Sequence, residues 1–365
     1  MYWNQYSESK LVNLEQKILS VLKTTYNTRY INITGDKDTE EKIWTISLNV
    51  KSDNTPLVLL HGFAAGIGFW VRNLDSLSKD RPVYALDLLG FGRSSRPEFS
   101  NDNFKAEQQM VDSIEAWRKQ MKLDKFILLG HSLGAYLATL YTISYPDQVK
   151  HLILADPWGF SDRSQSTRNP PLKFRILGFF LYPFTNLNPL ATVRGLGPFG
   201  PWWIQKMRGD ISNKFEDLFE DKSTIPNYIY HCNAQNPTGE TAFKSMIYGF
   251  GWAKNPMIYR MDNLKKEVPL TILFGSNTWM DKTVGPMIKE LRPDAFVDVQ
   301  MIDNAGHHIY TDQADEFNRI VIQTCHDVDL KNGNIFSGND NSHIMNESED
   351  ENIESRNNNS EMETI

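Results

Sequence analysis

The segment Gly130-His131-Ser132-Leu133-Gly134 places a serine between two glycines at the G-x-S-x-G spacing. Between a strand and a helix this spacing makes a sharp turn that projects the serine oxygen, and small flanking residues relieve the crowded backbone. The apolar run FILL precedes the segment, and the helical pattern LGAYLATLY follows it. We therefore predict that Ser132 is a nucleophile at the carboxyl end of a strand.

A serine hydroxyl at its normal pKa is a weak nucleophile, so a histidine base and an orienting carboxylate are expected downstream. His307 and His308 follow the last apolar strand. We choose His307 as the base, because the small Gly306 before it lets the loop orient the His307 ring. Asp281, in the loop after the run VPLTILFG, is the predicted carboxylate, and Asp156 is its main competitor. The expected site is Ser132, Asp281 and His307.

Acyl transfer also needs hydrogen-bond donors for the oxyanion of its tetrahedral intermediate. The backbone N–H of Phe63, which follows the run PLVLL, and that of Leu133 are the predicted donors. His61 is expected to brace the loop that carries Phe63.

His307 and Asp312 form a second pattern, H-x-x-x-x-D. The same spacing occurs in glycerolipid acyltransferases, where a His–Asp pair activates an acceptor hydroxyl. The simpler interpretation is that Asp312 caps the closing helix or supplies an acid to its first turn. Both interpretations stay open at this point.

The elements that must position these residues alternate between strands and helices. The predicted strands are 43–50, 56–63, 81–90, 125–132, 150–157, 268–275 and 296–302, and the helices are 105–121, 133–145, 284–291 and 312–328. Several strands are continuous apolar runs, which is typical of strands buried on both faces of a parallel sheet. The alternation predicts an α/β fold with a mostly parallel, doubly wound sheet.

Four kinds of segment divide the chain. We expect an N-terminal amphipathic segment over residues 1–30, the α/β core over residues 31–157 and 263–330, a mostly helical cap over residues 158–262, and a disordered acidic tail over residues 331–365. The N-terminal helix either packs on the domain or anchors at a membrane surface.

The aromatic residues of the cap allow three interpretations. They form a small core of their own, line an acyl pocket or enter a lipid surface. The residues are Phe174, Phe179, Phe180, Trp202 and Trp203.

Composition excludes several classes of protein. The 365 residues are 40% hydrophobic and 23% charged, which is ordinary for a globular chain. The net charge is −7, and residues 331–365 contribute −6 of it, so the nearly neutral body argues against nucleic-acid binding. The two cysteines lack zinc-ligand spacing, and the sequence lacks a nucleotide-binding glycine pattern. We therefore expect neither a metal nor an organic cofactor. The N-terminus lacks a secretory pattern, and a reducing compartment is expected.

The motifs HGF, DLLGFGRSSRP, GHSLG and GHHIYTD occur in this order, and with them the chain resembles the α/β-hydrolase fold family. DPWGF, NYIYHCNAQNPTGETAFKSM and HHIYTDQ narrow the resemblance. They are similar to the branch that holds the lysophospholipase of N-acyl phosphatidylethanolamines and the lipid-droplet co-activator of adipose triglyceride lipase.

The resemblance implies a serine hydrolase of the lysophospholipase or phospholipase B type, with Ser132, Asp281 and His307 as the triad. The co-activator carries asparagine at the nucleophile position, so Ser132 makes this chain more similar to the hydrolase sister. The alternatives are an acyl-CoA-dependent lysophosphatidic acid acyltransferase that uses His307 and Asp312, or a non-catalytic co-activator of a triglyceride lipase. The implied partners are a glycerophospholipid, a peripheral lipid surface, and a lipase or lipid-droplet coat protein. The implied location is cytoplasmic, at the surface of lipid droplets or the endoplasmic reticulum.

Overall fold

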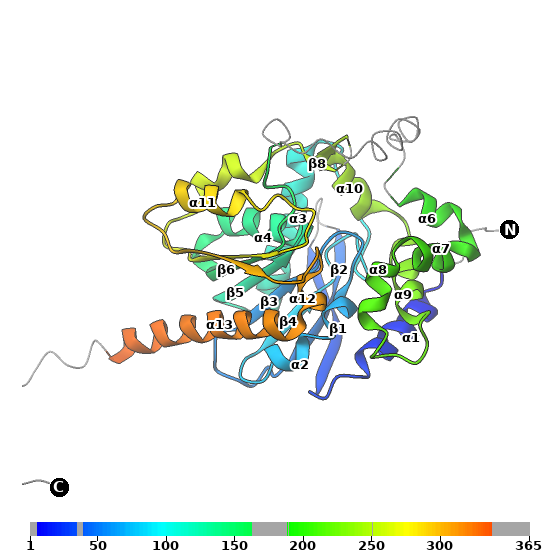
Figure 1. Cartoon of the computed structure of the whole chain (residues 1–365), viewed down its shortest axis with the longest axis horizontal. Helices are drawn as coiled ribbons and strands as arrows, with labels where there is room; N and C mark the ends of the chain where they lie inside the picture. Colours follow the sequence, from blue (N-terminus) through cyan, green and yellow to red (C-terminus); the bar gives the residue numbers. More distant parts are fainter. Residues whose placement is uncertain (1–5, 35–38, 163–187, 189, 250, 338–365) are drawn as a thin grey trace, which may run out of the picture. The chain divides into compact units, whose positions relative to one another are not determined.

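The computed structural model describes residues 6–34, 39–162, 188, 190–249 and 251–337 (Figure 1). The chain divides into two compact units, residues 1–329 and residues 330–365. The candidate site lies wholly in the first unit.

Eight strands of the described residues form one sheet in the order β1-β2-β4-β3-β5-β6-β9-β10. Their bounds are β1 (Tyr26–Thr34), β2 (Glu40–Leu48), β3 (Leu57–Leu60), β4 (Val83–Leu86), β5 (Phe126–His131), β6 (Val149–Ala155), β9 (Leu270–Gly275) and β10 (Val297–Ile302). β1 and β2 pair antiparallel, β2 joins β4 antiparallel, and the remaining neighbours are parallel. The predicted mostly parallel α/β sheet is therefore confirmed, and the antiparallel edge strand β1 extends it.

Helices cover both faces of this sheet (Figure 1). They are α1 (Glu8–Leu19), α2 (Leu74–Leu77), α3 (Asn103–Met121), α4 (Leu133–Ser144), α11 (Val284–Leu291), α12 (Ile309–Asp312) and α13 (Ala314–Ser337), with 3₁₀ helices η2 (Ile67–Trp70), η3 (Pro146–Gln148) and η8 (Met257–Asn263). Because α13 runs to Ser337, the segment expected to be a tail begins inside a helix, and residues 338–365 lie outside the described ones.

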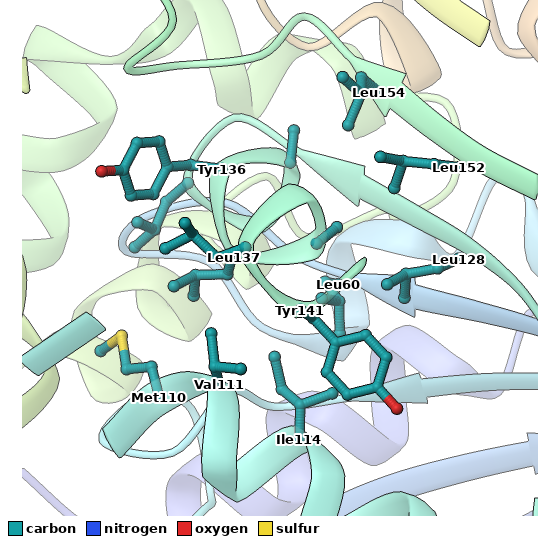
Figure 2. Packing of buried hydrophobic residues seen from close by; sticks show 14 of the residues in the cluster. Leu60, Met110, Val111, Ile114, Leu128, Tyr136, Leu137, Tyr141, Leu152 and Leu154 are labelled. Atoms are coloured by element: carbon teal, nitrogen blue, oxygen red, sulfur yellow. The ribbon is translucent and has the colours of Figure 1, made fainter. Parts of the chain in front are cut away.

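Alternate residues of the central strands enter two separate hydrophobic cores. Val58 and Leu60 of β3 pack with α3, α4 and α11, whereas Leu57 and Leu59 pack with α1, α2, α12 and the first part of α13. Figure 2 shows the first of these cores, where side chains of β3, β5 and β6 meet those of α3 and α4. Burial on both faces explains why these strands read as continuous apolar runs.

The segment between β6 and β9 departs from the strand and helix alternation. Besides η8, its described elements are α6 (Ala191–Gly195), η6 (Gly197–Phe199), α7 (Gly200–Met207), α8 (Gly209–Ser212), η7 (Asn213–Phe215), α9 (Thr224–Asn233), α10 (Thr238–Met246) and the strand pair β7 (Ile247–Tyr248) and β8 (Trp252–Ala253). From here on the name cap is restricted to residues 190–249, the longest stretch of the expected cap (158–262) that the structure describes without a gap. Of the aromatic residues singled out in the sequence, Trp202 is exposed and Trp203 half-buried, and Phe174, Phe179 and Phe180 lie outside the described residues.

The N-terminal helix packs onto the domain. Ser7 caps α1 by accepting a hydrogen bond from the backbone N–H of Lys10, and the face of α1 that carries Ile18 is buried. Glu15, which is only 1% exposed, pairs with Arg93 at 2.7 Å and accepts from the indole N–H of Trp44 at 2.8 Å. Burial raises the pKa of Glu15 to about 7. A buried ion pair therefore ties α1 to the loop after β4.

A helix needs about 20 consecutive, mostly apolar residues to span a bilayer. Within the described residues, no helix is both long enough and apolar enough to do so.

Candidate active site

Ser132 lies at the turn between β5 and α4, with φ at 54° and ψ at −115°. This left-handed backbone conformation is strained for a residue with a side chain. The glycines of the motif are needed for close packing: a Cβ added to Gly130 would meet the backbone N of Ala135 at 2.6 Å, and one added to Gly134 would meet the carbonyl of His61 at 2.5 Å. The sequence motif therefore folds into the sharp strand-to-helix turn that its spacing predicts.

His307 lies in the loop after β10, between Ser132 and a buried carboxylate. Its Nε2 is 3.0 Å from Ser132 Oγ, and its Nδ1 is 2.6 Å from Asp156 Oδ2. The two contacts fix the tautomer, since Nδ1–H donates to Asp156 and Nε2 is left to accept from the serine hydroxyl. Of the two adjacent histidines, His307 is therefore the one that contacts the serine, while the ring of His308 stacks on Phe69 at 6.3 Å.

Asp156 directly follows β6, which lies beside β5 in the sheet. Its side chain is fully buried and accepts a hydrogen bond from the Thr278 hydroxyl at 2.6 Å and from the Gly275 backbone N–H at 3.2 Å. Together with His307 Nδ1–H, these donors hold both carboxylate oxygens in place.

The prediction that Asp281 orients His307 is wrong for this structure. The Asp281 carboxylate instead accepts hydrogen bonds from the backbone N–H of Thr283 at 3.1 Å and from its hydroxyl at 2.7 Å, in the turn that leads into α11. Strand β6 is adjacent to the nucleophile's strand β5, whereas β9 is one strand further away, so Asp156 reaches the site directly. The competing candidate from the sequence therefore contacts the histidine.

Two hydrogen bonds hold the backbone around His307. Its carbonyl oxygen accepts from Nε2–H of His131 at 2.9 Å, and the N–H of the preceding Gly306 donates to Asp312 Oδ2 at 2.8 Å. The only signal for His131 in the sequence is its position next to the nucleophile.

Burial sets the charge state of the histidine and the carboxylate. It lowers the pKa of His307 to about 3, and the positive charges of Arg208 and Lys214 in the cap act in the same direction. Burial also raises the pKa of Asp156 to about 7, against the hydrogen bonds from Thr278 and Gly275. Because the two groups share a hydrogen bond, they titrate as a pair. Above about pH 7 we expect a neutral imidazole beside a carboxylate.

The loop that carries Phe63 borders the nucleophile. A Cβ added to Gly62 would lie 3.1 Å from Ser132 Cβ, and Leu133 opens the first turn of α4. The backbone N–H groups of Phe63 and Leu133 as oxyanion donors remain a prediction. His61 is buried, with its Nδ1 2.7 Å from the Gly62 carbonyl and its Nε2 accepting from the Leu88 N–H at 3.0 Å. The bracing role expected of His61 agrees with these contacts.

The arrangement can support covalent catalysis at a serine. Such chemistry requires a base within hydrogen-bond distance of the serine hydroxyl, and a carboxylate on the far side of that base. Within the described ranges, no group of three or more His, Cys, Asp or Glu side chains is placed to hold a metal ion.

Comparison with known proteins identifies the class. The model of the alpha/beta hydrolase fold family matches residues 55–193. Close relatives extend the match to most of the chain. The chain belongs to the alpha/beta hydrolase family.

Two groups of relatives are nearly equal in similarity. The human (lyso)-N-acylphosphatidylethanolamine lipase is 48% identical over 327 residues, which cover 88% of this chain and 93% of the human protein. The mouse 1-acylglycerol-3-phosphate O-acyltransferase ABHD5 is 47% identical over 328 residues, which cover 88% of this chain and 91% of the mouse protein. The resemblance to this branch of the family is confirmed, and sequence identity alone does not separate its two members.

Solved structures show the same fold at low identity. The naproxen esterase of Bacillus subtilis aligns with a TM-score of 0.58 and 16% identity, covering 88% of this chain and 99% of the esterase. A bacterial membrane phospholipase A aligns with a TM-score of 0.60 and 20% identity, covering 88% of this chain and 90% of the phospholipase.

Proposed function

We propose that the protein is a serine hydrolase that removes acyl chains from N-acyl phosphatidylethanolamine, its lyso form or related glycerophospholipids. One observation carries the proposal: the hydrogen-bonded series from Ser132 Oγ through His307 to the buried Asp156. The substrate class comes from the relatives named as (lyso)-N-acylphosphatidylethanolamine lipases.

The reaction proceeds through an acyl-enzyme. Ser132 Oγ attacks the ester carbonyl while His307 Nε2 takes the serine proton, and Asp156 stabilises the imidazolium that forms. The N–H groups of Phe63 and Leu133 hold the oxyanion, and the imidazolium gives its proton to the departing alcohol. A water molecule then attacks the acyl-enzyme, His307 takes its proton, and the fatty acid leaves as Ser132 is reprotonated.

Covalent labelling by a fluorophosphonate tests the nucleophile. Wild-type protein and Ser245→Ala should be labelled, since Ser245 is a comparably buried serine whose hydroxyl donates to a helix carbonyl of α10. Ser132→Ala should not be labelled and should release no fatty acid from a lyso-N-acyl phosphatidylethanolamine. Labelling of a folded Ser132→Ala protein, or lipid hydrolysis by it, would refute the proposal.

An exposed apolar surface of the cap supports action at a lipid surface. Phe199, Trp202 and Met207 are 60%, 58% and 56% exposed. Lys206 Nζ lies 5.2 Å from the centre of the Trp202 ring. An aromatic ring beside an ammonium group suits the boundary between head groups and acyl chains.

Vesicle sedimentation tests this surface. Trp202→Ala should weaken binding to phospholipid vesicles, whereas Phe104→Ala should not, because Phe104 is equally exposed, at 59%, but lies on α3. Equal binding by the two variants would remove the cap from membrane contact. A peripheral location at lipid droplets or the endoplasmic reticulum is part of the same proposal, and it requires that the cap surface bind lipid.

A non-catalytic co-activator is the alternative that the ABHD5 relatives suggest. The assembled Ser132 and His307 pair favours hydrolysis over that alternative. Binding to a triglyceride lipase that survives Ser132→Ala, together with absent labelling of wild-type protein, would reverse this preference.

A further inference from the structure

Asp312 joins the cap to the loop that carries His307. Its Oδ2 accepts from the Gly306 N–H at 2.8 Å, and its Oδ1 lies 2.7 Å from Lys214 Nζ in η7 of the cap. The side chains of Lys214 and Asp312 are only 17% and 14% exposed, so this ion pair is mostly shielded from water. One carboxylate therefore connects a cap residue with the residue before the histidine.

The cap is held to the core around Lys214 by further contacts. The Lys214 carbonyl accepts from Arg72 Nε at 2.8 Å, and the Arg72 guanidinium also pairs with Asp217. The buried ring of Phe215 packs edge-on against Phe69 at 5.9 Å. The backbone of Lys214 is thus anchored to the core, at a place from which its ammonium reaches Asp312.

The contacts of Asp312 give the H-x-x-x-x-D spacing a physical meaning. The carboxylate of Asp312 contacts the backbone of Gly306, while the ring nitrogens of His307 contact Ser132 and Asp156. A residue that activated an acceptor hydroxyl with His307 would have to reach that ring or the hydroxyl. The observed partners instead fix the position of the loop.

We propose that Asp312 is a positioning residue that, through its ion pair with Lys214, couples seating of the cap to alignment of His307 with Ser132. This inference rests on the proposed hydrolase function. When the cap segment around Lys214 lies against the core, Lys214 holds the Asp312 carboxylate in place, and that carboxylate in turn holds the Gly306 N–H. When the segment lifts, Asp312 loses its cation and the loop loses its fixed position.

The size of the effect follows from the geometry. The contact between His307 Nε2 and Ser132 Oγ is 3.0 Å, and a misplacement of about 1 Å costs on the order of 100-fold in rate. Lys214→Met and Asp312→Asn should each lower kcat on a soluble p-nitrophenyl ester by about 10- to 100-fold, with little change in KM. Lys214→Arg, which keeps the charge, should restore most of the rate.

The double variant Lys214→Met with Asp312→Asn decides between coupling and two separate effects. Coupling predicts that it is no slower than the slower single variant, because the same ion pair is already broken. Lys222→Met is the matched control, since Lys222 pairs with Glu216 at 3.2 Å elsewhere in the cap and should leave kcat unchanged. Melting temperatures of all variants separate loss of fold from loss of alignment.

Three results from the rate and product measurements would overturn the inference. The first is an unchanged kcat in both single variants, and the second is a double variant in which the two rate losses multiply. The third is an Asp312→Asn protein that still hydrolyses esters but no longer forms phosphatidic acid from lysophosphatidic acid and acyl-CoA. Fluorophosphonate labelling of the wild-type protein is the separate test of the hydrolase function. If the wild type is labelled and Lys214→Met is labelled at the same rate, the hydrolase function stands and the coupling between the cap and His307 is refuted.

Discussion

Replacing Asp156 by asparagine keeps the size of the side chain and removes the charge that faces His307 Nδ1 at 2.6 Å. The amide can present its NH₂ to Nδ1, which would favour the wrong tautomer and leave Nε2 protonated toward Ser132. In serine proteases the equivalent change lowers kcat about 10⁴-fold, which corresponds to about 5 kcal/mol of transition-state stabilisation. We expect a loss of this order for Asp156→Asn.

Asp281→Asn is the matched comparison. The Asp281 carboxylate accepts from Thr283 in a turn, and an asparagine oxygen accepts equally well there, so its rate should stay within about twofold of wild type. The assay is kcat/KM on a water-soluble p-nitrophenyl ester, which avoids any effect of lipid binding. Thermal melting checks that the buried Asp156→Asn side chain leaves the protein folded. A loss of a thousandfold in Asp281→Asn with an active Asp156→Asn would refute the assignment of Asp156.

The remaining predictions concern titration, backbone space and the N-terminal helix. The kcat/KM on a soluble ester should rise as pH rises through about 7, because the raised pKa of Asp156 keeps its carboxyl protonated below that pH. Thr278→Val removes a hydrogen-bond donor to the Asp156 carboxylate and should move this rise in kcat/KM to higher pH. An unshifted profile would contradict the assignment of Asp156 as the carboxylate of the site. Gly134→Ala should lower the free energy of unfolding by about 1–3 kcal/mol in denaturant titrations, because its Cβ meets two carbonyls of β3 and the loop after it. The pKa of Glu15 is raised from 4.5 to about 7 in the fold, so its contribution to stability falls as pH rises between these values. The difference in unfolding free energy between wild type and Glu15→Gln should therefore change over that interval and be flat above it.

The sequence predicts most of what positions the site, because its signals are local. The strand-to-helix turn at Ser132 is determined by two glycines and by the apolar runs on either side of it. The strand and helix alternation predicts the order of layers, since both faces of a parallel sheet must be covered. The edge strand β1 was not predicted because only Ile31 and Ile33 of its nine residues are buried, so its apolar signal is weak.

The choice of carboxylate could not be made from the sequence. Asp156 and Asp281 both follow predicted strands, and their distances to His307 depend on which strand lies beside β5 in the finished sheet. The order β5-β6-β9 places Asp156 on the nearer strand. The contact between Lys214 and Asp312 is equally invisible, because it joins the cap to a loop about one hundred residues later and depends on how the cap is seated.

The separation of Asp156 and His307 by 151 residues determines when the protein can first act during synthesis. At the usual 5–20 residues per second, a ribosome needs roughly 8–30 s to add that stretch. The nucleophile and its carboxylate therefore emerge without a base, and a nascent chain cannot attack an ester until His307 has been added. A chain that ends inside the cap would therefore carry Ser132 without the histidine that activates it.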